Sequence, residues 1–121
     1  RAMVGEEPIT LYGDGEQTRD FTFVRDAVAA TIAAANRGEP GSVYNIGGGA
    51  RVSVNQVLDL MAACTGMQPR IQRSPAQKGD MRDTYADTTA ARESLGFRPI
   101  VPLEAGIEEE YRWISNAVTH V

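Results

Sequence analysis

Hydrophobic and polar residues along this chain fall into short segments of two kinds. Apolar, β-branched and aromatic residues gather at Ile9–Tyr12 and Thr18–Val24, on either side of a glycine turn at residues 13–15, which predicts two strands. These strands either pair as a hairpin or flank a loop. Two further short strands are predicted at Ser42–Ile46 and Arg70–Arg73.

The pattern changes to a helical period after the second strand. Asp26 is the predicted N-cap of a first helix, which ends at Gly38. Because residues spaced by three and four positions lie on one side of a helix, Val28, Ile32 and Ala35 share a face. Because the helix is thin and rich in alanine, we expect close packing against a neighbouring element more than a bulky core face.

Three more helices are predicted farther along the chain. Ser53 and Gln56 form a capping box that opens a helix ending at Gly66. The other two helices are predicted at Thr88–Leu95, with Asp87 as the cap, and at Leu103–Val118.

Three consecutive glycines, Gly47, Gly48 and Gly49, follow the third predicted strand. They match neither the G-x-G-x-x-G pattern nor a P-loop, which also needs a lysine. We interpret them as a turn that needs positive φ angles. Close approach of a ligand to the backbone is the alternative.

Short strands alternating with helices predict the α/β fold class. The strands are too few for a complete doubly wound sheet, which needs several parallel strands covered on both faces. A chain of 121 residues is one domain or a piece of something larger. Residues 1–8 resemble the last turn of a helix that begins farther upstream.

Composition narrows the possible functions. The formal net charge is −4 and no basic block occurs, so nucleic acid and anionic membranes are not expected as partners. The longest apolar-leaning run, Ala27–Ala35, is too short to span a bilayer. Cys64 and His120 are the single cysteine and histidine, which excludes a disulfide framework or a zinc cluster within one chain. We expect no metal and a cytoplasmic location.

Arg19 is the residue whose chemistry most needs an explanation. In an extended strand it shares a face with Phe21 and Phe23, because side chains alternate. A cation on an apolar face is costly unless an anion meets it. The anion is either a carboxylate of the chain, such as Asp20, or a phosphate or carboxylate of a ligand. The residues alone leave both open.

The polar segment at residues 74–83 is longer and more charged than a simple connection requires. Loops of this kind often line binding sites, and a solvated connector is the alternative.

Several motifs together resemble the carboxy-terminal part of the extended short-chain dehydrogenases/reductases (SDRs) that act on nucleotide sugars. The resemblance covers essentially the whole chain. The motifs are residues 13–24 with Asp26, residues 44–49 with Ser53, Gly79-Asp80 with residues 85–87, and residues 95–99 with Gly106 and Trp113.

This resemblance implies a part of an NAD-dependent epimerase or dehydratase. Residues 1–121 would be the C-terminal nucleotide-sugar-binding portion, without a complete Rossmann domain. The glycine fingerprint for NAD is absent, and so is the Tyr-x-x-x-Lys pair, since Ser74 stands four residues before Lys78. NAD therefore belongs to the parent enzyme, with the missing Rossmann domain as a partner. We expect this chain alone to contain no catalytic residues and to be inactive.

The resemblance also implies a set of substrate-binding residues. Arg19 would meet the nucleotide diphosphate, for which a planar guanidinium is well suited. The backbone around Thr10 and Tyr12 would hold the uracil edge. Gln17 and Asp80 would lie near the phosphate and ribose, although Asp80 could instead tether Arg19 or only hold the loop.

Gln77 is a departure from many UDP-glucose 4-epimerases, which have a second phosphate-binding arginine at this position. Epimerases of the UDP-glucuronate type resemble this chain in having glutamine, and Arg82 in the same loop could substitute. Asp20 and Asp26 are assigned structural roles, in strand-end pairing and helix capping.

The resemblance therefore favours a UDP-glucose or UDP-glucuronate 4-epimerase as the parent enzyme. One alternative is a part of a nucleotide-sugar dehydratase or decarboxylase. Another is a non-catalytic binding or self-associating module, which could form a homo-oligomer.

Overall fold

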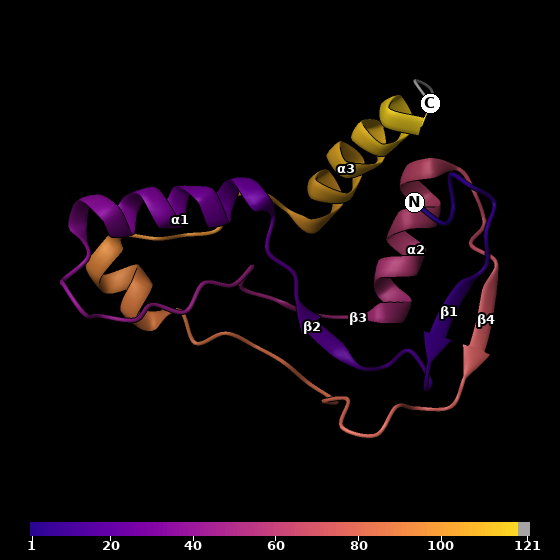
Figure 1. The fold of residues 1–121 in the computed structure, drawn as a ribbon, viewed down its shortest axis with the longest axis horizontal. Coiled ribbons are helices and arrows are strands. Elements are labelled where there is room, and N and C mark those ends of the chain that lie inside the picture. The colour runs from indigo at the N-terminus through magenta and orange to yellow at the C-terminus, as the bar shows by residue number, and fades with distance from the viewer. Residues whose placement is uncertain (119–121) are drawn as a thin grey trace.

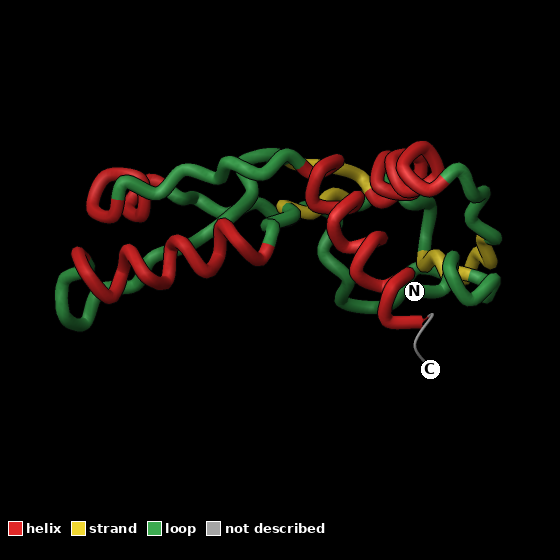
Figure 2. Tube along the Cα trace, turned by 90° about the horizontal axis from the view of Figure 1, so that it is seen from above, coloured by secondary structure: helices red, strands yellow, loops and turns green. Residues whose placement is uncertain are grey.

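A computed structural model describes residues 1–118. The molecule is elongated and has two lobes, with α1 and η1 in one and α2, α3, β1 and β4 in the other, and β2 and β3 lie between them (Figures 1 and 2). The elements are β1 Ile9–Tyr12, β2 Thr18–Asp20, α1 Val24–Arg37, β3 Arg51–Ser53, α2 Val54–Thr65, β4 Ile71–Ser74, the π-helical turn η1 Ala91–Leu95, and α3 Leu103–Val118.

The strands form two separate pairs. β1 runs parallel to β4, and β2 runs antiparallel to β3. The first two strands therefore flank a loop and do not form a hairpin. The predicted α/β class is confirmed, and so is the strand at Arg70–Arg73, shifted by one residue.

Two strand predictions need correction. Residues 42–46 are not a strand, and Val43 is 86% exposed, because no described strand lies beside this segment to share its hydrogen bonds. β2 ends at Asp20 and not at Val24, since the chain leaves the sheet to begin α1. β3 pairs with β2 and was not predicted from its three residues.

Helix α1 begins at Val24 and its N-cap is Phe23, three residues before the predicted cap Asp26. Asp26 lies in the first turn with 2% of its surface exposed. Its Oδ2 accepts hydrogen bonds from the amides of Ile100 and Val101, at 3.1 Å each. The carboxylate therefore ties α1 to the segment that leads into α3.

The buried face of α1 is also not the predicted one. Val28 and Ile32 are 51% and 57% exposed, whereas Ala30 is buried. Ala30 packs in a small core with Ala91, Leu95 and Phe97. Small side chains allow η1 to approach α1 closely, which is why the alanines and not the bulkier residues face inward.

Local signals placed α2 and α3 correctly, while the helix predicted at Thr88–Leu95 is observed as the shorter turn η1 at Ala91–Leu95. Ser53 Oγ accepts a hydrogen bond from the Gln56 amide while the Gln56 side chain accepts one from Ser53, which confirms the capping box. Gly66 ends α2 in the left-handed conformation, with φ of 69°. Asp87 accepts from the Thr89 amide, a contact that lowers the pKa of Asp87, and Gly96 closes the turn with φ of 68°. α3 has the predicted bounds.

Residues 1–7 form a turn with the hydrogen-bond pattern of a helix C-terminus. The Glu7 amide donates to the Ala2 carbonyl and the Glu6 amide donates to the Met3 carbonyl. Glu6 has φ of 54°, as in a Schellman motif. Met3 is buried beside an apolar groove of about 290 Å³ that runs between α2 and α3.

None of the described helices is both long and apolar enough to cross a membrane. Within residues 1–118, no group of three or more His, Cys, Asp or Glu side chains could hold a metal ion. His120 lies outside the described residues.

Candidate functional site

A tight turn brings the chain from β1 to β2 at the edge of the candidate site. Gly13 and Gly15 have φ of 76° and 83°, a conformation that side chains disfavour. A Cβ atom on Gly15 would also collide with Asn55 Oδ1, so this turn sits directly on the start of α2. The turn places Asp14 and Gln17 in the lining of a cavity, and the Gln17 side chain reaches the carbonyl of Tyr12 at the end of β1.

Arg19 on β2 meets three acceptors of the chain. Its Nη1 donates to the carbonyls of Thr18 and Met81, both at 2.8 Å, and its Nη2 donates to Asp80 Oδ1 at 2.5 Å. Both side chains of the ion pair are partly open to solvent, 29% for Arg19 and 39% for Asp80. A carboxylate of the chain therefore pairs with Arg19, and that carboxylate is Asp80, not Asp20.

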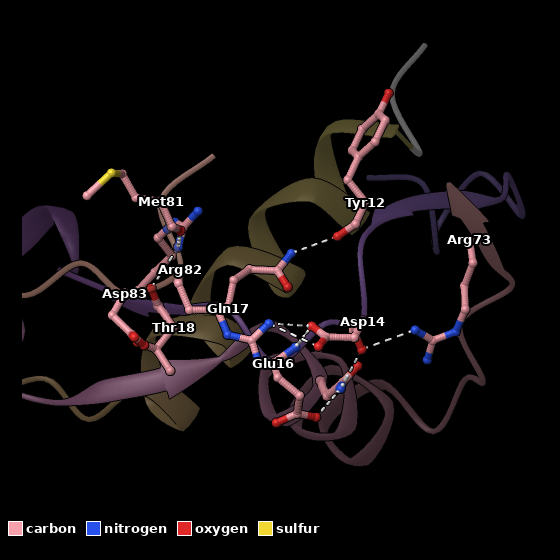
Figure 3. A network of polar contacts seen from close by, with 11 residues as sticks. Tyr12, Asp14, Glu16, Gln17, Thr18, Arg73, Met81, Arg82 and Asp83 are labelled. Carbon is pink, nitrogen blue, oxygen red and sulfur yellow. Dashed lines mark hydrogen bonds and ion pairs between the residues drawn. The ribbon is translucent and has the colours of Figure 1, made fainter. Parts of the chain in front are cut away.

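A second ion pair closes the same loop against the glycine turn. Arg82 Nη1 lies 2.9 Å from each carboxylate oxygen of Asp14, which gives Arg82 a defined direction (Figure 3). The Glu16 amide and the Arg82 guanidinium lower the pKa of Asp14, and Asp14 raises the pKa of Arg82. Asp14 was not among the predicted site residues, although its place between two glycines was a usable signal.

Gln17 bridges the start of β2 and the end of β1. Its Nε2 donates to the carbonyl of Tyr12 at 2.9 Å (Figure 3). This carbonyl, which sequence reasoning assigned to a ligand's base, has Gln17 as its partner in the structure.

Five of the seven predicted residues line one cavity of about 200 Å³: Tyr12, Gln17, Gln77, Asp80 and Arg82, together with Gly13, Asp14, Ala76 and Met81. Arg19 touches this lining through Asp80 and Met81. Thr10 does not line the cavity, because it lies in the middle of β1, paired with Gln72 of β4. The cavity thus brings together residues that are more than sixty positions apart in the sequence.

The backbone amides of the glycine-rich segment 47–49 bind a carboxylate, which is the side chain of Asp20. Asp20 Oδ1 accepts hydrogen bonds from the amides of Gly48 and Gly49, at 2.7 and 3.0 Å. Among these glycines only Gly49 has a positive φ angle, of 84°. The predicted turn is correct at Gly49, while Gly47 and Gly48 are needed for close approach.

A dinucleotide phosphate does not fit this segment. The carboxylate of Asp20 already occupies its amides and would repel a second anion. A phosphate at this segment would have to displace the carboxylate of Asp20.

These features define an α/β chain with a polar cavity that is lined by Asp14, Asp80 and Arg82. A family model described as GDP-mannose 4,6 dehydratase matches residues 1–110. The chain therefore belongs to this family of NAD-dependent epimerases and dehydratases, and corresponds to the carboxy-terminal part of its members.

Curated and solved relatives carry epimerase and dehydratase names. The chain is 32% identical over 115 residues to UDP-glucose 4-epimerase of Mycolicibacterium smegmatis, covering 95% of this chain and 37% of that one. It is 35% identical over 106 residues to dTDP-glucose 4,6-dehydratase of Streptomyces griseus, covering 87% and 32%. The crystal structure of UDP-glucuronic acid 4-epimerase from Bacillus cereus, in complex with UDP-glucuronic acid and NAD, matches with a TM-score of 0.89 and 32% identity, covering 96% and 38%.

The chain spans only about a third of the length of these relatives. The rest of each relative has no counterpart among the 121 residues.

Proposed function

We propose that residues 1–121 are the nucleotide-sugar-binding portion of an NAD-dependent sugar 4-epimerase that acts on UDP-glucose or UDP-glucuronate. The cavity at β1, β2 and the 75–82 segment is the observation that carries this proposal. Arg82 lines this cavity, and Arg19 contacts two of its lining residues, Asp80 and Met81. Two arginines beside polar groups suit a phosphorylated polar ligand. The epimerase names of the relatives support the same reaction class.

In this proposal Arg19 contacts the diphosphate, and Asp80 either shares Arg19 with it or moves aside. Gln17 releases the Tyr12 carbonyl to the base, while Gln77 and Arg82 face the phosphates or the sugar. The backbone of Thr10 would contribute from β1, although its side chain lies outside the cavity lining.

The cavity volume predicts weak binding by this chain alone. Sites for small molecules usually enclose about 300 to 1,000 Å³, and this cavity has about 200 Å³. A nucleotide sugar would therefore extend beyond these walls, and a preceding Rossmann domain would supply the others. We assign NAD and the catalytic residues to that domain, and the parent enzyme to the cytoplasm.

The test is a titration with UDP, followed by the amide resonances of the ¹⁵N-labelled chain. We expect a Kd on the order of 1 mM for the wild type, because one or two charge-assisted contacts contribute a few kcal/mol. Arg19→Ala should weaken binding by at least about tenfold. Arg19→Lys should lie between the two, since it keeps the charge but loses the planar fork.

Arg98→Ala is the matched control, because Arg98 is exposed and does not line the cavity. Equal affinities of Arg19→Ala, Arg98→Ala and the wild type would contradict a phosphate-binding role for Arg19.

A self-associating module is the second candidate function. Val24, Val28 and Ile32 form an exposed apolar stripe on α1, of a kind that often marks a protein interface. Sedimentation velocity over a hundredfold range of concentration would test this candidate. A mass that stays monomeric throughout would exclude it.

A further inference from the structure

We propose that Asp20 is the positioning residue of the candidate site. By accepting hydrogen bonds from the glycine-rich segment 47–49, its carboxylate fixes residues 80–86, the segment that supplies two of the three acceptors of Arg19. The effect on ligand binding rests on the proposed function, while the effect on the segment itself does not.

The Asp20 carboxylate joins three parts of the chain that are distant in sequence. Its Oδ1 accepts from the amides of Gly48 and Gly49, and its Oδ2 accepts from the amide of Ala86 at 3.2 Å. Successive backbone amides form a concave anion site, and hydrogen bonds to an ionised carboxylate are stronger than those between neutral groups. Asp20 therefore binds the glycine segment and residue 86 to the end of β2.

The glycines themselves are explained by this contact. A Cβ atom on Gly47 would collide with Asp20 Oδ2, and one on Gly48 would collide with the Phe21 carbonyl oxygen. Neither glycine has a positive φ angle, so backbone conformation does not require them. What requires them is the close approach of the chain at Asp20 and Phe21.

Residues 80–86 are held in place mainly by contacts with other segments of the chain. Residues 80–85 are exposed, so no apolar core anchors this wall of the cavity. The segment is instead held by a series of polar contacts with residues 14–20. These contacts are Arg82 with Asp14, Asp83 and Thr84 with Thr18, Asp80 with Arg19, and Ala86 with Asp20.

Asp20 lies at the end of this series and is adjacent to Arg19. Loss of the Ala86 contact would release the C-terminal end of this segment. The neighbouring bond from the Thr84 amide to the Thr18 carbonyl, at 3.2 Å, would weaken with it. Arg51 of β3 lies over the Tyr85 ring at 5.2 Å, a contact that depends on the same placement. The geometry of Arg19 relative to Asp80 and Met81 thus depends on Asp20.

Asp20→Asn tests the proposal with the smallest change in shape. One amide oxygen can still accept from Gly48 and Gly49, but the NH₂ group would face the Ala86 amide, donor against donor. We expect amide exchange at Thr84 and Ala86 to accelerate by about tenfold, as the loss of a charge-assisted bond implies. The Arg19 Nη–H resonances should shift toward those of a solvated arginine, because Nη1 and Nη2 make the bonds to Met81 and Asp80, and UDP affinity should fall by about tenfold.

Asp59→Asn is the control, because Asp59 is an exposed acid on α2 and the change in charge is the same. It should leave all three readouts unchanged. Measurements are made at a temperature at which α2 amides exchange equally in both variants, so that general unfolding cannot explain a difference.

Two results would overturn the proposal. Unchanged protection at Thr84 and Ala86 would show that Asp20 does not hold the segment. Lost protection with an unaltered Arg19 resonance would show that Asp20 has a local structural role only. If wild-type chain does not bind UDP, the proposed function fails, whereas exchange and the Arg19 resonance still decide the role of Asp20.

Discussion

Replacing Asp26 by alanine should destabilise the fold strongly, because this buried carboxylate holds two amides. The Ile100 and Val101 amides, whose bonds to Asp26 are partly buried, would lose their acceptor, and each unsatisfied amide would cost up to about 1 to 3 kcal/mol. Water reaching the vacated space reduces this cost, so we expect a loss of about 3 kcal/mol in the free energy of unfolding. That is a large share of the roughly 5 to 15 kcal/mol typical of a domain.

The assay is urea denaturation followed by circular dichroism, with the wild type, Asp26→Ala and Asp26→Asn compared. Asparagine retains an oxygen that can accept both amides, so Asp26→Asn should lose only about 1 kcal/mol. Asp59→Ala, an exposed substitution on α2, should change stability by less than about 0.5 kcal/mol. A loss below about 1 kcal/mol for Asp26→Ala would refute the anchoring role.

Two further predictions concern local contacts. Ser53→Ala removes the N-cap of α2 and should cost about 1 kcal/mol in the same denaturation assay, with an unchanged stability arguing against the capping box. The lowered pKa of Asp14 means that its pairing with Arg82 contributes stability above the unfolded-state value near 3.8, and that this contribution is lost as the pH falls through the folded-state pKa. Asp14→Asn should therefore reduce stability at about pH 6 and have little effect at the acid end, and equal effects at both pH values would contradict this.

The polar groups of the site already have hydrogen-bond partners that a ligand would replace. Arg19 is satisfied by Asp80 and two carbonyls, and the Tyr12 carbonyl is satisfied by Gln17. Because these partners belong to the protein, a ligand would replace existing hydrogen bonds with new ones. The net free energy of binding gained from these contacts is therefore small. This exchange is a second reason to expect weak binding by the chain alone.

The sequence alone determined the features that depend on neighbouring residues. The capping box of Ser53 and Gln56, the glycine that ends α2 and the bounds of α3 follow from hydrogen bonds and side-chain spacing within a few positions. Five of the seven residues that the resemblance selected line the cavity, whereas Thr10 does not and the lining residue Asp14 was missed. Arg19 stands out in the sequence by its chemistry, since a cation close to two phenylalanines along the chain needs an anion, although β2 ends before both phenylalanines.

Only the tertiary structure decided which distant groups meet. A strand at residues 42–46 requires a neighbouring strand, and its residues cannot reveal that none of the described strands lies beside it. Asp26 is typical of a helix cap, but its partners lie more than seventy positions away. In the same way, the pairing of Arg19 with Asp80 and of Asp20 with the glycine amides depends on how the loops pack. Local propensity cannot predict such contacts, because it depends only on neighbouring residues.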